Sequence, residues 1–74
     1  MGRITSNPKI LGGKPIISGT RISVEFVLEL LASGVAPKEI IADYPQVSSD
    51  DIQACLRYAA GFIKNDVIID IEAA

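Results

Sequence analysis

The 74-residue sequence contains no histidine, no tryptophan and only one cysteine, Cys55. Without histidine, the chain lacks the side chain that most often performs general acid–base catalysis. A single cysteine can form neither an intrachain disulfide nor a zinc site. Because Cys55 has no general base beside it in the sequence, we interpret it as a small buried hydrophobe. These absences predict a protein that is not an enzyme and that uses no metal or other cofactor.

Long apolar runs are also missing, and none approaches the roughly 20 residues of a membrane span. Residues 1–5 lack the apolar stretch of a signal peptide. We therefore expect a cytoplasmic protein without a membrane partner. Hydrophobic residues nevertheless make up 49% of the chain, and a domain this short buries little of its surface. Since disulfides and metals are excluded, self-association, most simply as a homodimer, is the expected source of added stability.

Acidic residues are absent before Glu25, whereas four of the seven basic residues lie there: Arg3, Lys9, Lys14 and Arg21. The other three basic residues and all nine acidic residues follow, so a cationic segment precedes an acidic body. This segment either faces an anionic partner or is a solubilising surface with chance clustering. The net charge of −2 argues weakly against a general affinity for nucleic acid.

Turn-forming pairs separate short apolar pieces throughout residues 1–22. This pattern predicts a small β-hairpin, with Gly12 and Gly13 at its turn. Pro15 can lie only at the start of a strand or on an edge, because proline has no backbone N–H to donate, so the hairpin should be small and exposed on one side.

Three helices are predicted after the hairpin. Ser23 is a typical N-cap for a first helix over residues 24–33, which should end at Gly34. That helix is apolar around most of its circumference, so we expect it to be covered on two sides. A second, short helix begins near Pro37 and ends before Pro45.

The third helix is expected over residues 49–64, where Ser48 and Asp51 resemble a capping box. Asp50 and Asp51 stabilise the positive end of its dipole, which explains them better than a metal site does. The spacing predicts one buried stripe, formed by Ile52, Cys55, Leu56, Ala59 and Ile63. In the tail, residues 65–74 alternate as in a strand, and one face carries Val67, Ile69 and Ile71.

A short helix, a tight turn and a longer helix form the layout of a helix-turn-helix. On the third helix, Ser49, Gln53 and Arg57 recur every four residues away from the buried stripe. Glutamine and arginine read adenine and guanine edges in the major groove of double-stranded DNA, but an ordinary solvated face gives the same pattern. If DNA is bound, Lys38 and Lys64 are candidates for phosphate contacts.

Residues 10–22, ILGGKPIISGTRI, resemble the family called domain of unknown function 433. The resemblance covers residue 4 to about residue 60 and includes the later elements Gly34, PKEII from Pro37, DYP from Asp43, and Asp51-Ile52. It implies a homeodomain-like helix-turn-helix fold. It also implies the role of an antitoxin whose partner toxin resembles PIN-domain ribonucleases.

We therefore expect one mainly α domain, with a β-hairpin arm over residues 1–22, a three-helix core over 23–64 and a tail over 65–74. The leading hypothesis is an antitoxin-like interaction module that neutralises a PIN-like toxin, with binding of its operator DNA left open. The alternatives are a DNA-binding regulator without a toxin and a structural oligomerisation domain. Candidates for partner binding are Lys14 and Arg21, which suit an acidic nuclease site, and the tail residues Val67, Ile69 and Ile71, which suit a sheet edge.

Overall fold

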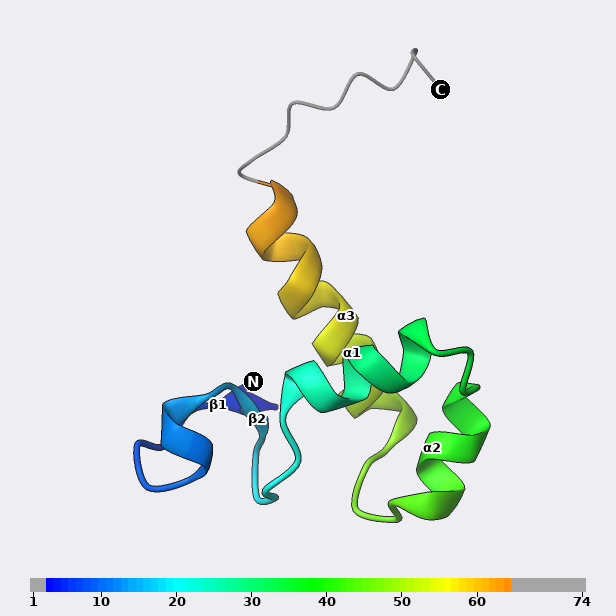
Figure 1. Cartoon of the computed structure of the whole chain (residues 1–74), viewed down its shortest axis with the longest axis horizontal. Helices are drawn as coiled ribbons and strands as arrows, with labels where there is room; N and C mark the ends of the chain where they lie inside the picture. The colour runs from blue at the N-terminus through cyan, green and yellow to red at the C-terminus, as the bar shows by residue number, and fades with distance from the viewer. Residues whose placement is uncertain (1–2, 65–74) are drawn as a thin grey trace.

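The computed structural model describes residues 3–64. Its elements, in chain order, are β1 (Ile4–Thr5), the 3-10 turn η1 (Leu11–Gly13), β2 (Ile16–Ile17), α1 (Val24–Ala32), α2 (Pro37–Asp43) and α3 (Ser49–Lys64) (Figure 1). The predicted fold class, a mainly helical chain with a small N-terminal hairpin, is confirmed. The strand predicted over the tail, with Val67, Ile69 and Ile71, lies outside the described residues.

The hairpin pairs β1 with β2 antiparallel, so that Ile4 lies opposite Ile17. The prediction that Gly12 and Gly13 form its tight turn was wrong. These two glycines instead lie inside the longer connection between β1 and β2, in η1, where both have positive φ. The strand that pairs with β2 is therefore residues 4–5, near the N-terminus. Leu11, which lies in η1, is 49% exposed.

The predicted boundaries of α1 follow from its caps. The Ser23 hydroxyl accepts a hydrogen bond from the Phe26 N–H at 2.9 Å, as an N-cap does. At the other end, Gly34 has a φ of 93°, and the Val35 N–H donates to the Leu30 carbonyl at 3.0 Å. This is the pattern of a Schellman motif, in which a left-handed residue allows the chain to leave the helix.

The start of α2 is capped from one side only. Ala36, at the N-cap position, has no side-chain oxygen, but the Glu39 carboxylate accepts a hydrogen bond from the Ala36 N–H at 2.9 Å. Pro37 occupies the first helical position, where its missing N–H costs nothing.

The hydrophobic core draws on β2, all three helices and the α2–α3 turn. Its fully buried members are Ile17, Val24, Val27, Ile40, Val47, Ile52 and Cys55. Leu56 was predicted to belong to the buried stripe of α3, but it is 42% exposed, so this prediction was wrong. Leu56 follows Cys55 directly and therefore lies about 100° around the helix from the line of contact.

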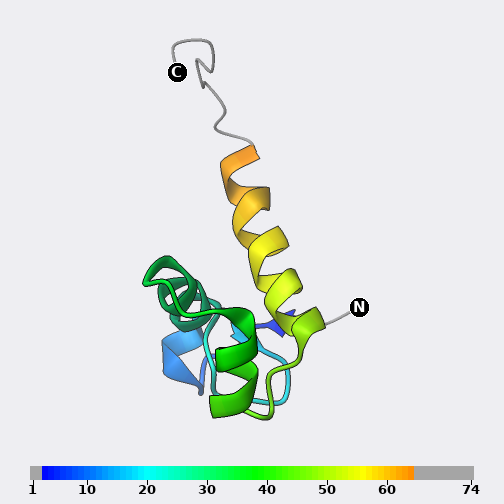
Figure 2. The same cartoon turned by 90° about the vertical axis from the view of Figure 1, so that its right-hand side faces the viewer.

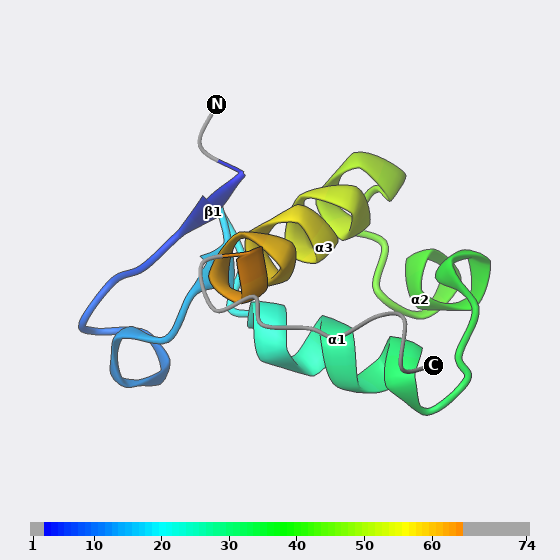
Figure 3. The ribbon, with the colours of Figure 1, turned by 90° about the horizontal axis from the view of Figure 1, so that it is seen from above.

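The longest helix, α3, extends beyond the rest of the fold. Its first half lies beside α1, between the hairpin and α2, when viewed from above (Figure 3). Its second half projects away from the body (Figure 2). The helix α1 contacts both α2 and α3. None of the described helices combines the length and the apolar character needed to cross a membrane.

Candidate partner-binding surfaces

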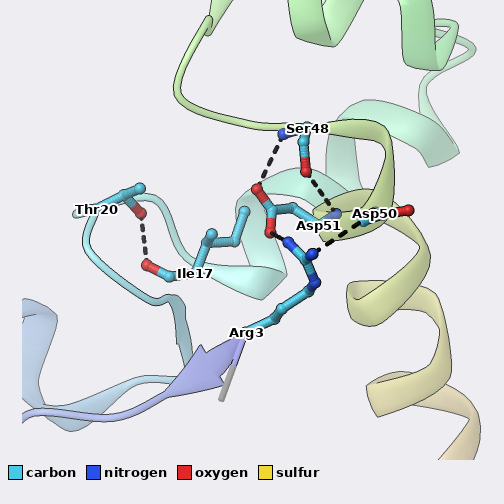
Figure 4. A network of polar contacts seen from close by, with 6 residues as sticks. All are labelled: Arg3, Ile17, Thr20, Ser48, Asp50 and Asp51. Carbon is cyan, nitrogen blue, oxygen red and sulfur yellow. Dashed lines mark hydrogen bonds and ion pairs between the residues drawn. The ribbon is translucent and has the colours of Figure 1, made fainter. Parts of the chain in front are cut away.

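The N-terminal arm is fastened to the start of α3 by a polar network around Asp51 (Figure 4). Asp51 Oδ2 accepts a hydrogen bond from the Ser48 N–H at 2.9 Å, and the Asp51 N–H donates to Ser48 Oγ at 3.1 Å. The predicted capping box is therefore present, with aspartate in the place of glutamate. Arg3 adds an ion pair to Asp51 Oδ1 at 2.9 Å and a longer one to Asp50 Oδ2 at 3.5 Å.

The network sets the charge of the buried Asp51 carboxyl. Burial alone raises its pKa, but hydrogen bonds from the Ser48 backbone N–H and the Arg3 guanidinium outweigh this and lower the pKa below its ordinary value. Asp51 therefore remains ionised at neutral pH and well below it. Both of its oxygens serve to hold α3 and the arm in place.

The basic residues of the arm differ in whether they form ion pairs within the chain. Arg3 is bound to Asp51 and Asp50, and Lys14 forms an exposed ion pair with Glu25 at 2.9 Å. The hydrogen bond to Glu25 raises the pKa of Lys14. In contrast, Arg21 is exposed and forms no ion pair with any described residue.

Arg21 is positioned by a hydrogen-bonded turn. Thr20 Oγ1 donates to the Ile17 carbonyl at 2.8 Å and accepts from the Ile22 N–H at 2.9 Å. Gly19 has a φ of 80°, which permits this tight turn. The backbone on both sides of Arg21 is thereby held in place, while its side chain is left exposed.

A hollow of about 730 Å³ lies beside Arg21, and we call it the arm hollow. It is lined by Thr5, Ser6, Asn7, Pro8, Ile10, Ile16, Gly19, Thr20, Arg21 and Gln46. Hydroxyl and amide side chains surround the single cationic one. Sequence reasoning identified Arg21 but missed Gln46, because this residue is brought to the hollow by the turn between α2 and α3.

The candidates for DNA reading occupy the surface of α3. Ser49, Gln53 and Arg57 are all exposed, as a solvated or a DNA-reading face requires. Lys38 is exposed on α2, and the side chain of Lys64 lies outside the described part of the structure. Asp50, also exposed, places negative charge at the N-terminal end of α3 that would face phosphates.

A second hollow lies between α1 and the projecting half of α3, and we call it the α1–α3 groove. It is about 550 Å³ in volume and is lined by Pro15, Val24, Glu25, Leu28, Glu29, Ala32, Tyr58, Ala59 and Phe62. The Tyr58 and Phe62 rings meet edge to face, with their centroids 5.2 Å apart. Phe62 is 62% exposed. This surface was not predicted from the sequence, although the two aromatic residues lie one helical turn apart.

Comparison with known proteins places this arrangement in a family. The family described as "Protein of unknown function (DUF433)" matches residues 4–59. The chain belongs to the DUF433 family. This confirms the resemblance that the Gly-Gly-Lys-Pro and Gly-Thr-Arg residues indicated.

Two proteins of similar sequence are longer than this chain. "Uncharacterized protein y4eO" of Sinorhizobium fredii is 34% identical over 56 residues, which make up 76% of this chain but 25% of that protein. The crystal structure of a DUF433 member protein from Anabaena variabilis has a TM-score of 0.78 and 30% identity, and the match covers 82% of this chain and 60% of that one. The chain thus spans a quarter of the curated relative and about three fifths of the solved structure.

The two hollows differ in how many of their lining residues fall within the segment that matches DUF433. All residues that line the arm hollow, from Thr5 to Gln46, fall within the matched segment of residues 4–59. The α1–α3 groove lies only partly within it, because Phe62 follows the end of the match. The arm hollow is therefore formed entirely from the part of the chain that defines its family membership.

Proposed function

We propose that this chain is an antitoxin-like protein-interaction module without catalytic activity, which acts in the cytoplasm. It binds the acidic active site of a PIN-like ribonuclease toxin and thereby neutralises the toxin. The observation that carries this proposal is Arg21, an exposed guanidinium with no ion pair among the described residues, held at the arm hollow. The identity of the toxin class comes from the family resemblance.

The chemistry of Arg21 suits clustered carboxylates. A guanidinium pairs with a carboxylate through two parallel hydrogen bonds, and it carries its charge at every physiological pH. A carboxylate seated at the arm hollow would also find hydroxyl and amide donors on Ser6 and Gln46. An arginine bound in this way competes with the metal ion or the RNA phosphate that a metal-dependent nuclease needs.

The other cations of the arm are less suited to this role. Arg3 is required at the start of α3, because it pairs with the buried Asp51. Lys14 remains a secondary candidate, since its ion pair with Glu25 is exposed and such pairs contribute little energy and exchange readily.

A DNA-binding regulator is the second candidate function. It is favoured by the α2–turn–α3 arrangement with Gln53 and Arg57 exposed on α3. Against it, Arg3 is neutralised by aspartates at the N-terminal end of α3, and Asp50 is exposed there. Any affinity for DNA should therefore be weak and strongly dependent on salt.

Co-expression tests the proposal. The full chain is produced together with the protein encoded by the neighbouring open reading frame, and ribonuclease activity and cell growth are measured. Arg21→Ala should weaken neutralisation strongly, and Arg21→Lys should retain it only in part, because lysine cannot pair bidentately. Lys9→Ala is the matched control, since Lys9 is an exposed arm cation outside the hollow.

A fourth variant addresses the tail. Deletion after Asn65 removes Val67, Ile69 and Ile71, the residues proposed to add a strand to a sheet edge of the partner. If this deletion and Arg21→Ala both leave neutralisation intact, neither segment carries the inhibition and the proposal fails.

A further inference from the structure

The face that α3 buries in the core continues onto its projecting half. Ile52, Cys55, Ala59 and Phe62 follow one another at helical spacing along this face. Ile52 and Cys55 are 2% and 0% exposed, Ala59 is half-buried, and Phe62 is 62% exposed. The apolar face therefore extends past the end of the body, where the α1–α3 groove lies open beside it.

Gly61, on the same half of α3, is not required to be glycine by any contact with the described residues. Gly61 lies inside the helix, where glycine is less favourable than alanine. A Cβ atom added at Gly61 would meet nothing within 4 Å, so the described residues do not require its absence. A hollow of about 370 Å³, lined by Arg57, Tyr58, Gly61 and Phe62, lies at this position. The missing side chain leaves room for another helix to approach closely.

The charges around the groove indicate what fills it. Glu25 and Glu29 are on the α1 side of the groove, and Glu25 is paired with Lys14 while Glu29 has no ion pair among the described residues. On α3, no acidic residue follows Asp51, and Arg57 has no ion pair among the described residues. Glu29 on one wall of the groove thus lacks an ion-pair partner within 4 Å, although Lys14 attracts it over a longer distance, and Arg57 on the projecting helix likewise lacks one among the described residues.

The chain's own tail matches this groove poorly. Residues 65–74 contain Asp66, Asp70 and Glu72 and no basic residue. Such a segment would bring negative charge toward Glu29, whereas the projecting half of a second α3 would bring Arg57.

We propose that the α1–α3 groove is the contact surface of a homodimer, in which the projecting half of α3 from each copy lies in the groove of the other. A two-fold axis makes the contact self-complementary, so each favourable interaction occurs twice. Phe62 of one copy packs against the apolar wall of the other, and Glu29 of each copy pairs with Arg57 of its partner. This inference concerns a different surface from the arm hollow and does not rest on the proposed function.

Sedimentation equilibrium on the purified full chain tests the dimer at micromolar concentrations. The wild type should sediment at about twice the monomer mass of 7.9 kDa. Phe62→Ser should weaken the dimer by at least about tenfold, because it removes a central aromatic contact. Leu11→Ser is the matched control, since Leu11 is also an exposed large hydrophobe but lies on the arm. Circular dichroism verifies that each variant is folded.

Gly61→Leu separates dimer formation from folding. Because the position faces open space, leucine should leave the monomer folded and raise the stability of α3. It should nevertheless weaken the dimer by at least about tenfold, since it fills the space that the partner helix occupies. A variant that is both folded and as dimeric as the wild type would overturn the proposal.

A charge exchange tests the partner directly. Glu29→Lys and Arg57→Glu should each weaken self-association, because each places like charges across the interface. Mixing the two variants should restore a dimer, since the lysine of one copy then meets the glutamate of the other. A mixture that associates no more tightly than either variant alone would overturn the proposal. A wild type that is monomeric throughout, or that dimerises only after residues 66–74 are removed, would overturn it as well.

Discussion

The carboxylate of Asp51 is expected to be one of the most important polar groups for stability. It accepts hydrogen bonds from the Ser48 N–H and from Arg3, both at 2.9 Å. Replacing it by alanine removes one half of a capping box, and an N-terminal cap is worth about 1 kcal/mol. The bond to the Arg3 guanidinium is charge-assisted, but Arg3 is half exposed, so we assign it about 1 kcal/mol. Asp51→Ala should therefore destabilise the fold by about 2 kcal/mol.

Thermal and urea unfolding followed by circular dichroism measure this loss. In a domain of this size, about 2 kcal/mol corresponds to a fall in Tm of roughly 8–16 °C. Asp50→Ala is the matched control, because Asp50 is exposed and its contact to Arg3 is 3.5 Å long. It should cost less than about 0.5 kcal/mol. Equal effects of the two substitutions would refute the assignment of the network to Asp51.

The same carboxylate makes stability depend on pH. Its pKa in the folded state is lowered from the ordinary value of 3.8. The stabilisation is therefore present above the unfolded-state pKa and is lost as the pH falls through the folded-state pKa. Wild-type stability should decline in acid below about pH 4, and Asp51→Asn should remove this part of the decline. Parallel pH profiles for the wild type and Asp51→Asn would contradict the argument.

Three further predictions follow from buried and exposed groups. Burial, and to a lesser degree the charge of Asp51, raises the pKa of the Cys55 thiol, so it should react with a disulfide reagent in urea but hardly at all in the native protein. Gly34→Ala should cost about 1–2 kcal/mol in urea unfolding, because its φ is 93°. If DNA is bound, fluorescence anisotropy at two salt concentrations should show that Arg57→Ala relaxes sequence preference, whereas Lys38→Ala weakens binding to all sequences alike.

The sequence predicted those features that depend on neighbouring residues. Ser23 was recognised as an N-cap and Ser48 with Asp51 as a capping box, because the donor and acceptor of each bond lie within three residues. Gly34 identified the end of α1, because glycine readily adopts the left-handed conformation that ends a helix. Local rules of this kind set the order and the approximate bounds of all three helices.

Features that depend on distant residues were missed. Ile17 pairs with Ile4 and not with Ile10 or Leu11, which are nearer in the sequence. The register of a hairpin depends on side-chain packing as well as on the spacing of apolar residues. Gln46 reaches the arm hollow only because the α2–α3 turn folds back toward the arm. Arg3 was recognised as a cation, but its pairing with Asp51, 48 residues away, could not be inferred from the sequence.

The central claim is that Arg21 at the arm hollow binds the acidic site of a partner protein. Isothermal titration of the full chain with the protein encoded by its neighbouring open reading frame tests it most directly. Removing one charge-assisted contact costs about 1.5–3 kcal/mol, so Arg21→Ala should weaken the affinity by roughly ten- to a hundredfold. Lys9→Ala should leave the affinity unchanged. Tight binding that Arg21→Ala does not weaken, or the absence of any binding by the wild type, would contradict the account.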